Sequence, residues 1–243
     1  HLSLRRQRQM CIRDRSLTNG TRGWNISNSS ANVAVKLTGS RRNDTLTGGI
    51  GDDTLNCGCG HDSLSGGAGN DVFEVSYGND TVDGGEGIDT VSYGNVRAGV
   101  TVNLSRTDSQ NTGGGGWDTL SNIEKIFGSA GNDSLTGSSG DDSIDGYLGA
   151  DTLDGGGGND NLNGGAGNDS LLGGDGNDTL AGNAGDDVLD GGGGADVATY
   201  RGASTGVTVS LAQSGQQDTV GDGKDTLTTI ENLTGSAFND SLT

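Results

Sequence analysis

The apolar residues of this chain recur one at a time, each between polar residues, at a spacing of nine. From Gly39 the sequence divides into nonapeptides such as GGAGNDVFE and GGEGIDTVS, and position 8 of each is apolar, usually leucine. Alternate side chains of a strand point to opposite faces, so positions 7–9 predict a short strand with one inward side chain. Positions 1–6 predict a turn, in which glycine permits positive φ and the Asn or Asp common at position 5 tolerates it. The period predicts a solenoid.

Arrays of these nonapeptides alternate with inserts. The two complete inserts have equal length and align without a gap, so that GVTVNL in one meets GVTVSL in the other. In chain order we expect the tail of an upstream insert (16–38), a first array of six nonapeptides (39–92), an insert (93–127), a second array of eight (128–199), an insert (200–234) and the start of a truncated third array (235–243). Two nonapeptides would form one coil, with a strand on each of two facing sheets. The predicted fold is all-β, a parallel β-roll or β-helix solenoid interrupted by two β-rich inserts.

Residues 1–15 do not fit this pattern, because they are rich in arginine and contain no glycine. Met10-Cys11-Ile12-Arg13-Asp14 resembles the translation of a transposon end used in sequencing libraries. We interpret residues 1–15 as a translated artefact and exclude them from fold reasoning. We expect the remainder to be an internal fragment of a longer gene product.

Composition excludes several classes of protein. The chain has 49 glycines in 243 residues and a formal net charge of −19, a combination typical of chains that stay disordered unless something is added. It has no long apolar run for a transmembrane helix. Its acidity argues against a nucleic-acid partner, since phosphate binding needs clustered Lys and Arg.

Position 6 is aspartate in all fifteen nonapeptides, and these residues are the candidate metal ligands. The candidates are Asp53, Asp62, Asp71, Asp80, Asp89, Asp133, Asp142, Asp151, Asp160, Asp169, Asp178, Asp187 and Asp196, with Asp44 and Asp240 at array ends. In an 18-residue coil each carboxylate lies about 4.8 Å from the next, where two charges repel by about 3.5 kcal/mol at an effective dielectric of 20. A cation between the turns would remove this repulsion, and carboxylate and carbonyl oxygens suit Ca²⁺ better than Mg²⁺, Zn²⁺ or Cu²⁺.

The pattern G-G-x-G-x-D-x-U-x resembles the calcium-binding nonapeptide of the repeats-in-toxin (RTX), or haemolysin-type, family, and GGAGNDSLL and GGDGNDTLA match every defined position. The resemblance implies a parallel β-roll with several Ca²⁺ ions between its turns. It also implies type I export, with folding outside the cell. If each ion needs nonapeptides one coil apart, the arrays allow at most four and six sites. Departures at Arg41, Arg42, Val75, Tyr147 and Phe238 put occupancy in doubt near array ends.

We therefore expect a non-enzymatic, calcium-binding structural stretch of a secreted, extracellular protein, such as a surface-associated adhesin with a cell-surface or matrix partner. The alternative is the C-terminal calcium-binding and export portion of a secreted protease, lipase or epimerase whose catalytic domain lies upstream. A disordered acidic linker is a third reading, and it predicts no ordering when calcium is added.

Two other motifs resemble chemical sites. Cys57, Cys59 and His61 read C-x-C-x-H, but they occupy positions 1, 3 and 5 of a nonapeptide in register and lack a fourth zinc ligand. We interpret them as turn substitutions, with a metal or redox site as the alternative. Residues 202–206 match the G-x-S-x-G elbow of esterases, but no helix is expected after them.

Overall fold

The computed structural model describes residues 23–28, 33–213 and 215–243, and these contain strands and turns but no helix. The segment interpreted as an artefact, residues 1–15, lies outside the described residues, as does part of the expected upstream insert. The chain forms two compact units. The first contains the described residues up to Val96 together with Arg106–Lys125, and the second contains Arg97–Ser105 together with Ile126–Thr243.

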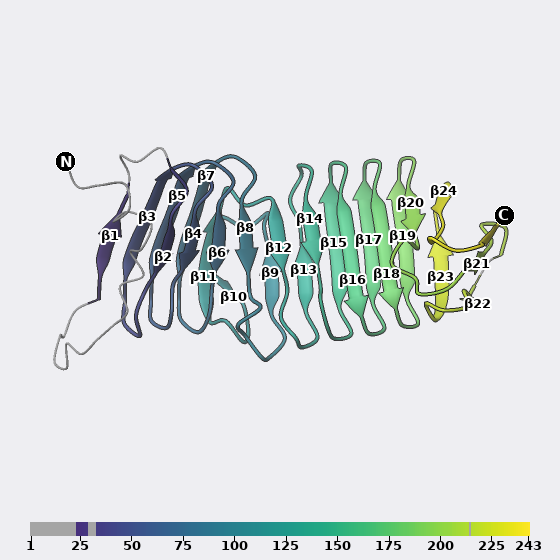
Figure 1. Ribbon diagram of the computed structural model, residues 1–243, viewed down its shortest axis with the longest axis horizontal. Coiled ribbons are helices and arrows are strands. Elements are labelled where there is room, and N and C mark those ends of the chain that lie inside the picture. The colour runs from purple at the N-terminus through teal and green to yellow at the C-terminus, as the bar shows by residue number, and fades with distance from the viewer. Residues whose placement is uncertain (1–22, 29–32, 214) are drawn as a thin grey trace. The chain divides into compact units, whose positions relative to one another are not determined.

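The first unit consists of two sheets whose strands alternate along the chain (Figure 1). One sheet has the order β1-β3-β5-β7-β11-β10 and the other has the order β2-β4-β6-β8. All neighbours are parallel except β10 and β11. The strands are β1 (Asn25–Ser27), β2 (Lys36–Thr38), β3 (Thr45–Ile50), β4 (Thr54–Asn56), β5 (Ser63–Ala68), β6 (Val72–Glu74), β7 (Thr81–Glu86), β8 (Thr90–Ser92), β10 (Gln110–Asn111) and β11 (Trp117–Ser121).

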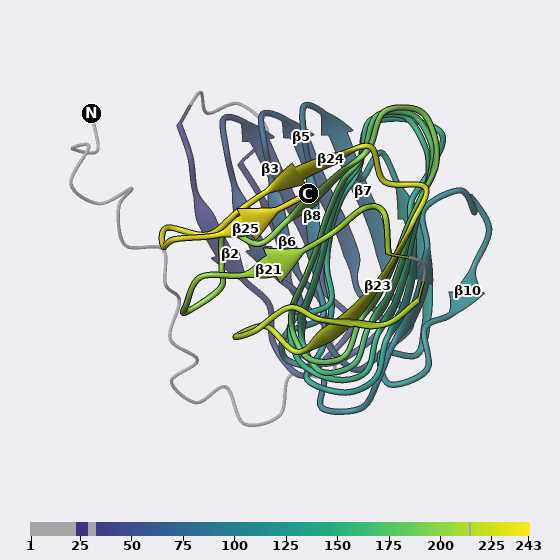
Figure 2. The ribbon, with the colours of Figure 1, turned by 90° about the vertical axis from the view of Figure 1, so that its right-hand side faces the viewer.

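The second unit repeats this arrangement, and its coils overlie one another when seen from the C-terminal side (Figure 2). One sheet runs β22-β23-β19-β17-β15-β13-β9, the other runs β12-β14-β16-β18-β20-β24, and β21 pairs with β25. The strands are β9 (Thr101–Asn103), β12 (Lys125–Phe127), β13 (Ser134–Thr136), β14 (Ser143–Asp145), β15 (Thr152–Gly157), β16 (Asn161–Ala166), β17 (Ser170–Asp175), β18 (Thr179–Ala184), β19 (Val188–Gly193), β20 (Val197–Thr199), β21 (Thr208–Val209), β22 (Gln217–Asp218), β23 (Lys224–Thr228), β24 (Asn232–Thr234) and β25 (Ser241–Leu242).

The coil is 18 residues long, as the sequence predicts. Leu46 is paired with Leu64 and Leu64 with Val82, while in the second unit Leu153 is paired with Leu171. These position-8 side chains are buried and form the core between the two sheets of each unit. Each buried leucine contributes about 2–3 kcal/mol, and the parallel ladders satisfy the backbone. The predicted all-β solenoid is therefore confirmed.

Strands are longer than the sequence pattern predicted. In several coils the strand continues from positions 7–9 through positions 1–3 of the next nonapeptide, as in β5 and β16. The ladder continues with them, since Gly67 is paired with Gly85 and Gly165 with Asn183. Because glycine has a low strand propensity, the sequence pattern did not predict that the strands continue through these glycines. The true turn is confined to positions 4–6.

Glycines at different positions have different functions. Those at positions 2 and 4 have positive φ, for example Gly156 at 98° and Gly158 at 112°. The glycine at position 1, such as Gly155, does not have a positive φ. It is needed because the absence of a side chain leaves space for neighbouring oxygens. The expectation that Asn or Asp at position 5 takes positive φ is wrong. Their side chains instead accept N–H groups from the next coil, as Asp141 does from Asn159 at 2.7 Å.

We expect Tyr147→Gly to stabilise the second unit by about 1 kcal/mol. Tyr147 holds a position-2 backbone at φ 76° with an exposed ring, and a non-glycine residue there is strained by about 1–3 kcal/mol. The measurement is urea unfolding in calcium. Tyr147→Ala removes the ring but keeps Cβ, so it is the matched control and should gain nothing; an equal gain in both variants would contradict the prediction.

Candidate calcium sites

The position-6 aspartates are buried despite their charge, and each lies directly before a strand. Their side chains form columns in which consecutive members lie one coil, or 18 residues, apart. All thirteen candidates from Asp53 to Asp196, and Asp44 as well, are buried, whereas Asp240 in the last nonapeptide is only partly buried. The structure thus brings the predicted residues together within each unit.

One carboxylate oxygen of each aspartate belongs to the backbone ladder. Asp62 N donates to Asp80 Oδ1 at 2.8 Å, and Asp151 N donates to Asp169 Oδ1 at the same distance. The same bond joins Asp160 to Asp178 and Asp178 to Asp196. Every Oδ1 in the column therefore fixes its carboxylate to the preceding coil.

The other oxygen, Oδ2, has no hydrogen-bond partner in ten of these buried aspartates. They are Asp53, Asp62, Asp71, Asp89, Asp151, Asp160, Asp169, Asp178, Asp187 and Asp196. A buried carboxylate oxygen without a partner is costly, because burial removes its hydration. An unsatisfied oxygen that recurs in ten of these aspartates indicates that these atoms face a ligand.

A cradle lies beside nine of these ten atoms, in the space left by the position-1 glycine; Asp62 has Cys57 at position 1 instead. A Cβ built on Gly155 would lie 2.3 Å from Asp160 Oδ2 and 2.5 Å from the carbonyl oxygen of Gly173 in the next coil. Gly146 has the same surroundings, with Asp151 Oδ2 at 2.4 Å and Gly164 O at 2.7 Å. Carboxylate and carbonyl oxygens in a flexible turn are the ligands that Ca²⁺ prefers, so the residues present fit this ion.

Burial raises the pKa values of these carboxyl groups, and the neighbouring carboxylates raise them further. The pKa of Asp62, Asp89 and Asp160 is raised to about 6. That of Asp80, Asp151 and Asp187 is raised to about 7. The columns therefore attract positive charge, whether a proton or a metal ion.

Four nonapeptides at or next to the start of an array differ, because serine replaces glycine at position 2. Ser129 N donates to Asp133 Oδ2 at 2.6 Å, and Ser138 Oγ donates to Asp142 Oδ2 at 2.9 Å. Ser40 and Ser236 contact Asp44 and Asp240 in the same way. Serine thus gives these four aspartates a partner from their own turn, a distinction that the sequence analysis did not draw although GS replaces GG there.

The inserts continue the columns, which the sequence analysis missed. Asp80 N donates to Asp118 Oδ1 at 2.9 Å, and Asp187 N donates to Asp225 Oδ1 at 3.1 Å. The signal was present, because GGGGWDTLS (113–121) is a complete nonapeptide and VGDGKDTLT (220–228) a degenerate one.

Glutamates end the other column of each unit. Asp89 N donates to Glu124 Oε2 and Asp196 N to Glu231 Oε2, each at 2.8 Å. These glutamates occupy position 6, because Glu124 lies nine residues before Asp133 and Glu231 nine residues before Asp240. The spacing therefore marked them, although the sequence analysis considered only aspartates. The backbone keeps the register of the column, since Lys125 N donates to Asp89 O as residues at position 7 do elsewhere.

Asp118 has hydroxyl partners in place of a cradle. Tyr93 OH donates to its Oδ2 at 3.0 Å and Thr112 Oγ1 at 2.9 Å, all three side chains being buried. Tyr200 is the equivalent of Tyr93 and is buried beside Asp225. Both tyrosines are buried in the inserts, and Tyr93 also satisfies the end of a column.

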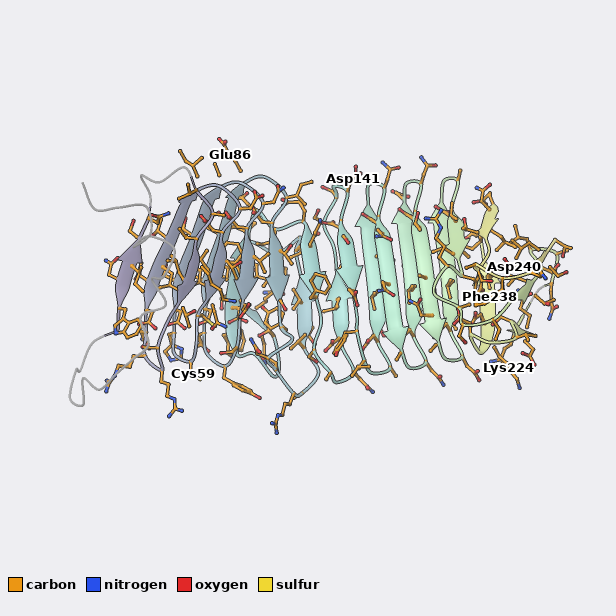
Figure 3. The ribbon with its side chains drawn as sticks, viewed as in Figure 1. Cys59, Glu86, Asp141, Lys224, Phe238 and Asp240 are labelled. Carbon is orange, nitrogen blue, oxygen red and sulfur yellow. The ribbon has the colours of Figure 1, made fainter. Side chains whose placement is uncertain are left out.

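The structure does not bring the three residues of C-x-C-x-H together. Cys57 is buried, whereas Cys59 and His61 are exposed, and Cys59 points outward from a turn (Figure 3). His61 Nδ1 accepts the backbone N–H of Asn79 at 2.8 Å, as asparagine does at position 5 elsewhere. Burial, and Asp80 beside it, raises the pKa of the Cys57 thiol to about 12.

Fold and columns together define a parallel β-roll whose turns are built to hold cations. A profile of the RTX calcium-binding nonapeptide repeat matches the chain four times, at residues 36–58, 60–91, 127–162 and 163–198, a little over half of the chain. The chain belongs to this family, and it is a calcium-binding β-roll module. A search of curated proteins found no match. Within the described ranges no helix is long and apolar enough to cross a membrane.

Without calcium, we expect the roll to be more stable near pH 4 than at neutral pH. The pKa of Asp151 and Asp187 rises from 3.8 to about 7 on folding, so stability present below the unfolded-state value is lost as the pH rises through the folded-state value. Far-UV circular dichroism of calcium-stripped protein from pH 4 to pH 8 measures this. A β signal that grows with pH in calcium-free buffer would contradict it, whereas calcium should reverse the trend.

We expect Gly155→Ala to abolish one calcium site, because its Cβ would fill the cradle at Asp160. Gly157→Ala is the matched control in the same nonapeptide, since its Cβ would meet nothing closer than 3.8 Å. Equilibrium dialysis with radioactive calcium should show one ion fewer per chain for the first variant alone. Equal binding by both variants would show that the cradle is not the site.

Proposed function

We propose that this module is part of a secreted bacterial RTX protein, crosses the membrane unfolded by type I export and folds outside the cell when it binds Ca²⁺. The observation that carries the proposal is the set of ten buried Oδ2 atoms that lack a hydrogen-bond partner. At neutral pH these oxygens need positive charge, and calcium is abundant outside cells and scarce in the cytosol. The calcium gradient would thus decide where the chain folds.

Energetic reasoning supports folding on calcium. Each nonapeptide buries about one large apolar side chain, which contributes about 2–3 kcal/mol, while ordering nine backbones costs about 9–18 kcal/mol. Ladder hydrogen bonds add about 1 kcal/mol each, and the stacked carboxylates repel. A ligand that binds only the folded state stabilises it by about 2.7 kcal/mol per site at a concentration of 100 Kd. Several such sites change the balance in favour of the roll.

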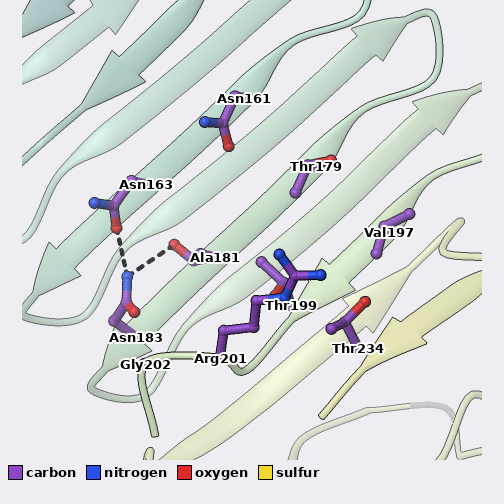
Figure 4. A pocket seen from close by; sticks show the side chains of 10 residues that line it. All are labelled: Asn161, Asn163, Thr179, Ala181, Asn183, Val197, Thr199, Arg201, Gly202 and Thr234. Carbon is purple, nitrogen blue, oxygen red and sulfur yellow. Dashed lines mark hydrogen bonds between the residues drawn. The ribbon is translucent and has the colours of Figure 1, made fainter. Parts of the chain in front are cut away.

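We further propose a structural, adhesin-like role without catalysis. An open hollow of about 490 Å³ lies over β16, β18 and β20 in the second unit (Figure 4). Its lining consists of Asn161, Asn163, Thr179, Ala181, Asn183, Val197, Thr199, Arg201, Gly202 and Thr234. This lining offers no carboxylate, thiol or imidazole for general acid–base or nucleophilic chemistry, and the repetition of array and insert favours an extended spacer.

The test is a calcium titration of the purified chain at neutral pH, followed by far-UV circular dichroism. We expect a transition from coil to β-structure with millimolar Ca²⁺ and none with Mg²⁺, which demands a smaller octahedral site. A chain that is equally folded in excess chelator, or that stays disordered in calcium, would refute the proposal.

Asp178→Asn should weaken this transition and lower stability in calcium by about 3–4 kcal/mol, the contribution of one site at 100–1,000 Kd. The amide keeps the Oδ1 acceptor of the ladder and removes the charge at Oδ2. Asp175→Asn, an exposed residue of the same nonapeptide, makes an equal change of net charge and is the matched control. With calcium, Asp178→Asn should be the less stable variant in urea unfolding. Without calcium it should be no less stable than Asp175→Asn, because the amide also removes a buried repelling charge.

A further inference from the structure

Cys57 places a thiol in a calcium-type cradle. Among the fifteen nonapeptides of the arrays, position 1 is glycine in all but two, in which it is Cys57 and Val75. Both side chains are buried, so each occupies the space that glycine leaves open elsewhere. Val75 fills that space with an apolar group, whereas Cys57 fills it with a metal-binding atom.

The surroundings of the thiol are polar. Cys57 Sγ lies 3.4 Å from the carbonyl oxygens of Gly58 and Glu74, and 3.9 Å from Asp80 Oδ2. Ser76 Oγ lies 3.8 Å from it. The sulfur, a carboxylate oxygen of Asp62 and one of Asp80 all lie within 4.8 Å of one another. All three side chains are more than nine-tenths buried, and Asp62 Oδ2 has no hydrogen-bond partner.

We propose that Cys57, Asp62 and Asp80 form a site for a thiophilic divalent cation such as Zn²⁺ or Cd²⁺. Thiolate selects soft or borderline ions, whereas Ca²⁺ binds oxygen ligands, so this coil discriminates against the ion that the other cradles fit. On binding, the thiol proton passes to water and a sulfur–metal bond forms. One thiolate and two carboxylates then surround the double positive charge, with carbonyl oxygens available to complete the shell.

Cys59 and His61 are not part of this site, although sequence spacing groups them with Cys57. Cys59 is exposed on the outer side of the turn, and the His61 ring accepts a hydrogen bond from Asn79. Metal selectivity therefore rests on the one cysteine that replaces a glycine, and the C-x-C-x-H pattern is not the ligand set.

The test uses the full chain kept folded in saturating Ca²⁺ and titrated with Cd²⁺. A Cys11→Ser/Cys59→Ser chain keeps Cys57 as its sole thiol, and a Cys11→Ser/Cys57→Gly chain keeps Cys59. We expect one Cd²⁺ per Cys57-only chain, seen as the ultraviolet thiolate-to-cadmium charge-transfer band. The affinity should be about 10–100-fold higher than in the Cys59-only chain, as expected for supported ligands.

Adding Asp80→Asn to the Cys57-only chain should lower cadmium affinity about tenfold without abolishing the band, since the thiolate remains. Binding by the Cys57-only chain that is no tighter than by the Cys59-only chain, or that is unchanged by Asp80→Asn, would overturn the proposal. Cys57→Gly introduces the residue usual at position 1, and circular dichroism in calcium verifies its fold.

This inference rests on the proposed function, because Asp62 and Asp80 belong to a proposed calcium column. The two can fail separately. A normal calcium transition without cadmium selectivity would refute only the Cys57 site. A chain that does not fold in calcium would refute the proposed function, whatever cadmium does.

Discussion

The repulsion between buried carboxylates is the constraint on which the rest of this structure depends. A coil of 18 residues stacks aspartate on aspartate, and the apolar core beneath, about one side chain per nonapeptide, is too thin to offset unsatisfied charge. Position 6 supplies the charge, position 1 supplies room beside it, and position 8 supplies the core. Each requirement alone is ordinary, but together they produce a fold whose stability depends on cations.

The ends of each column show the same constraint. Every column of N–H···Oδ1 bonds has a last aspartate whose N–H needs an acceptor, and the inserts supply Asp118 and Glu124 in one unit and Asp225 and Glu231 in the other. At the beginning of an array, serine satisfies Oδ2 from within its own turn. The inserts and the GS nonapeptides therefore terminate the cation columns with protein groups, which explains why both inserts carry these residues at matching positions.

Sequence reasoning predicted the elements that repeat and missed those that interrupt the repeat. The nine-residue period determines both the coil and the buried position 8, so Leu64, Leu153 and their equivalents were predictable. The extension of strands through glycines was not, because ladder pairing between coils overrides the low strand propensity of residues such as Gly67. The function of Glu124 was missed because a glutamate stands in place of the aspartate, although it lies nine residues before Asp133. The sequence showed that cysteines replace the usual residues at Cys57 and Cys59, but only the structure shows that Cys57 is buried and Cys59 exposed.

Whether an array contains an even or an odd number of nonapeptides has a structural consequence. In the second unit β9, from one insert, and β23, from the next, lie in the same sheet, because the eight nonapeptides between them make four whole coils. Adding or removing 18 residues keeps that relation, whereas a change of nine would transfer the later insert to the opposite sheet. The first array, of six nonapeptides, is also even. Array length in such a solenoid can therefore vary in steps of two nonapeptides, each step adding one coil of cation cradles while the insert keeps its sheet.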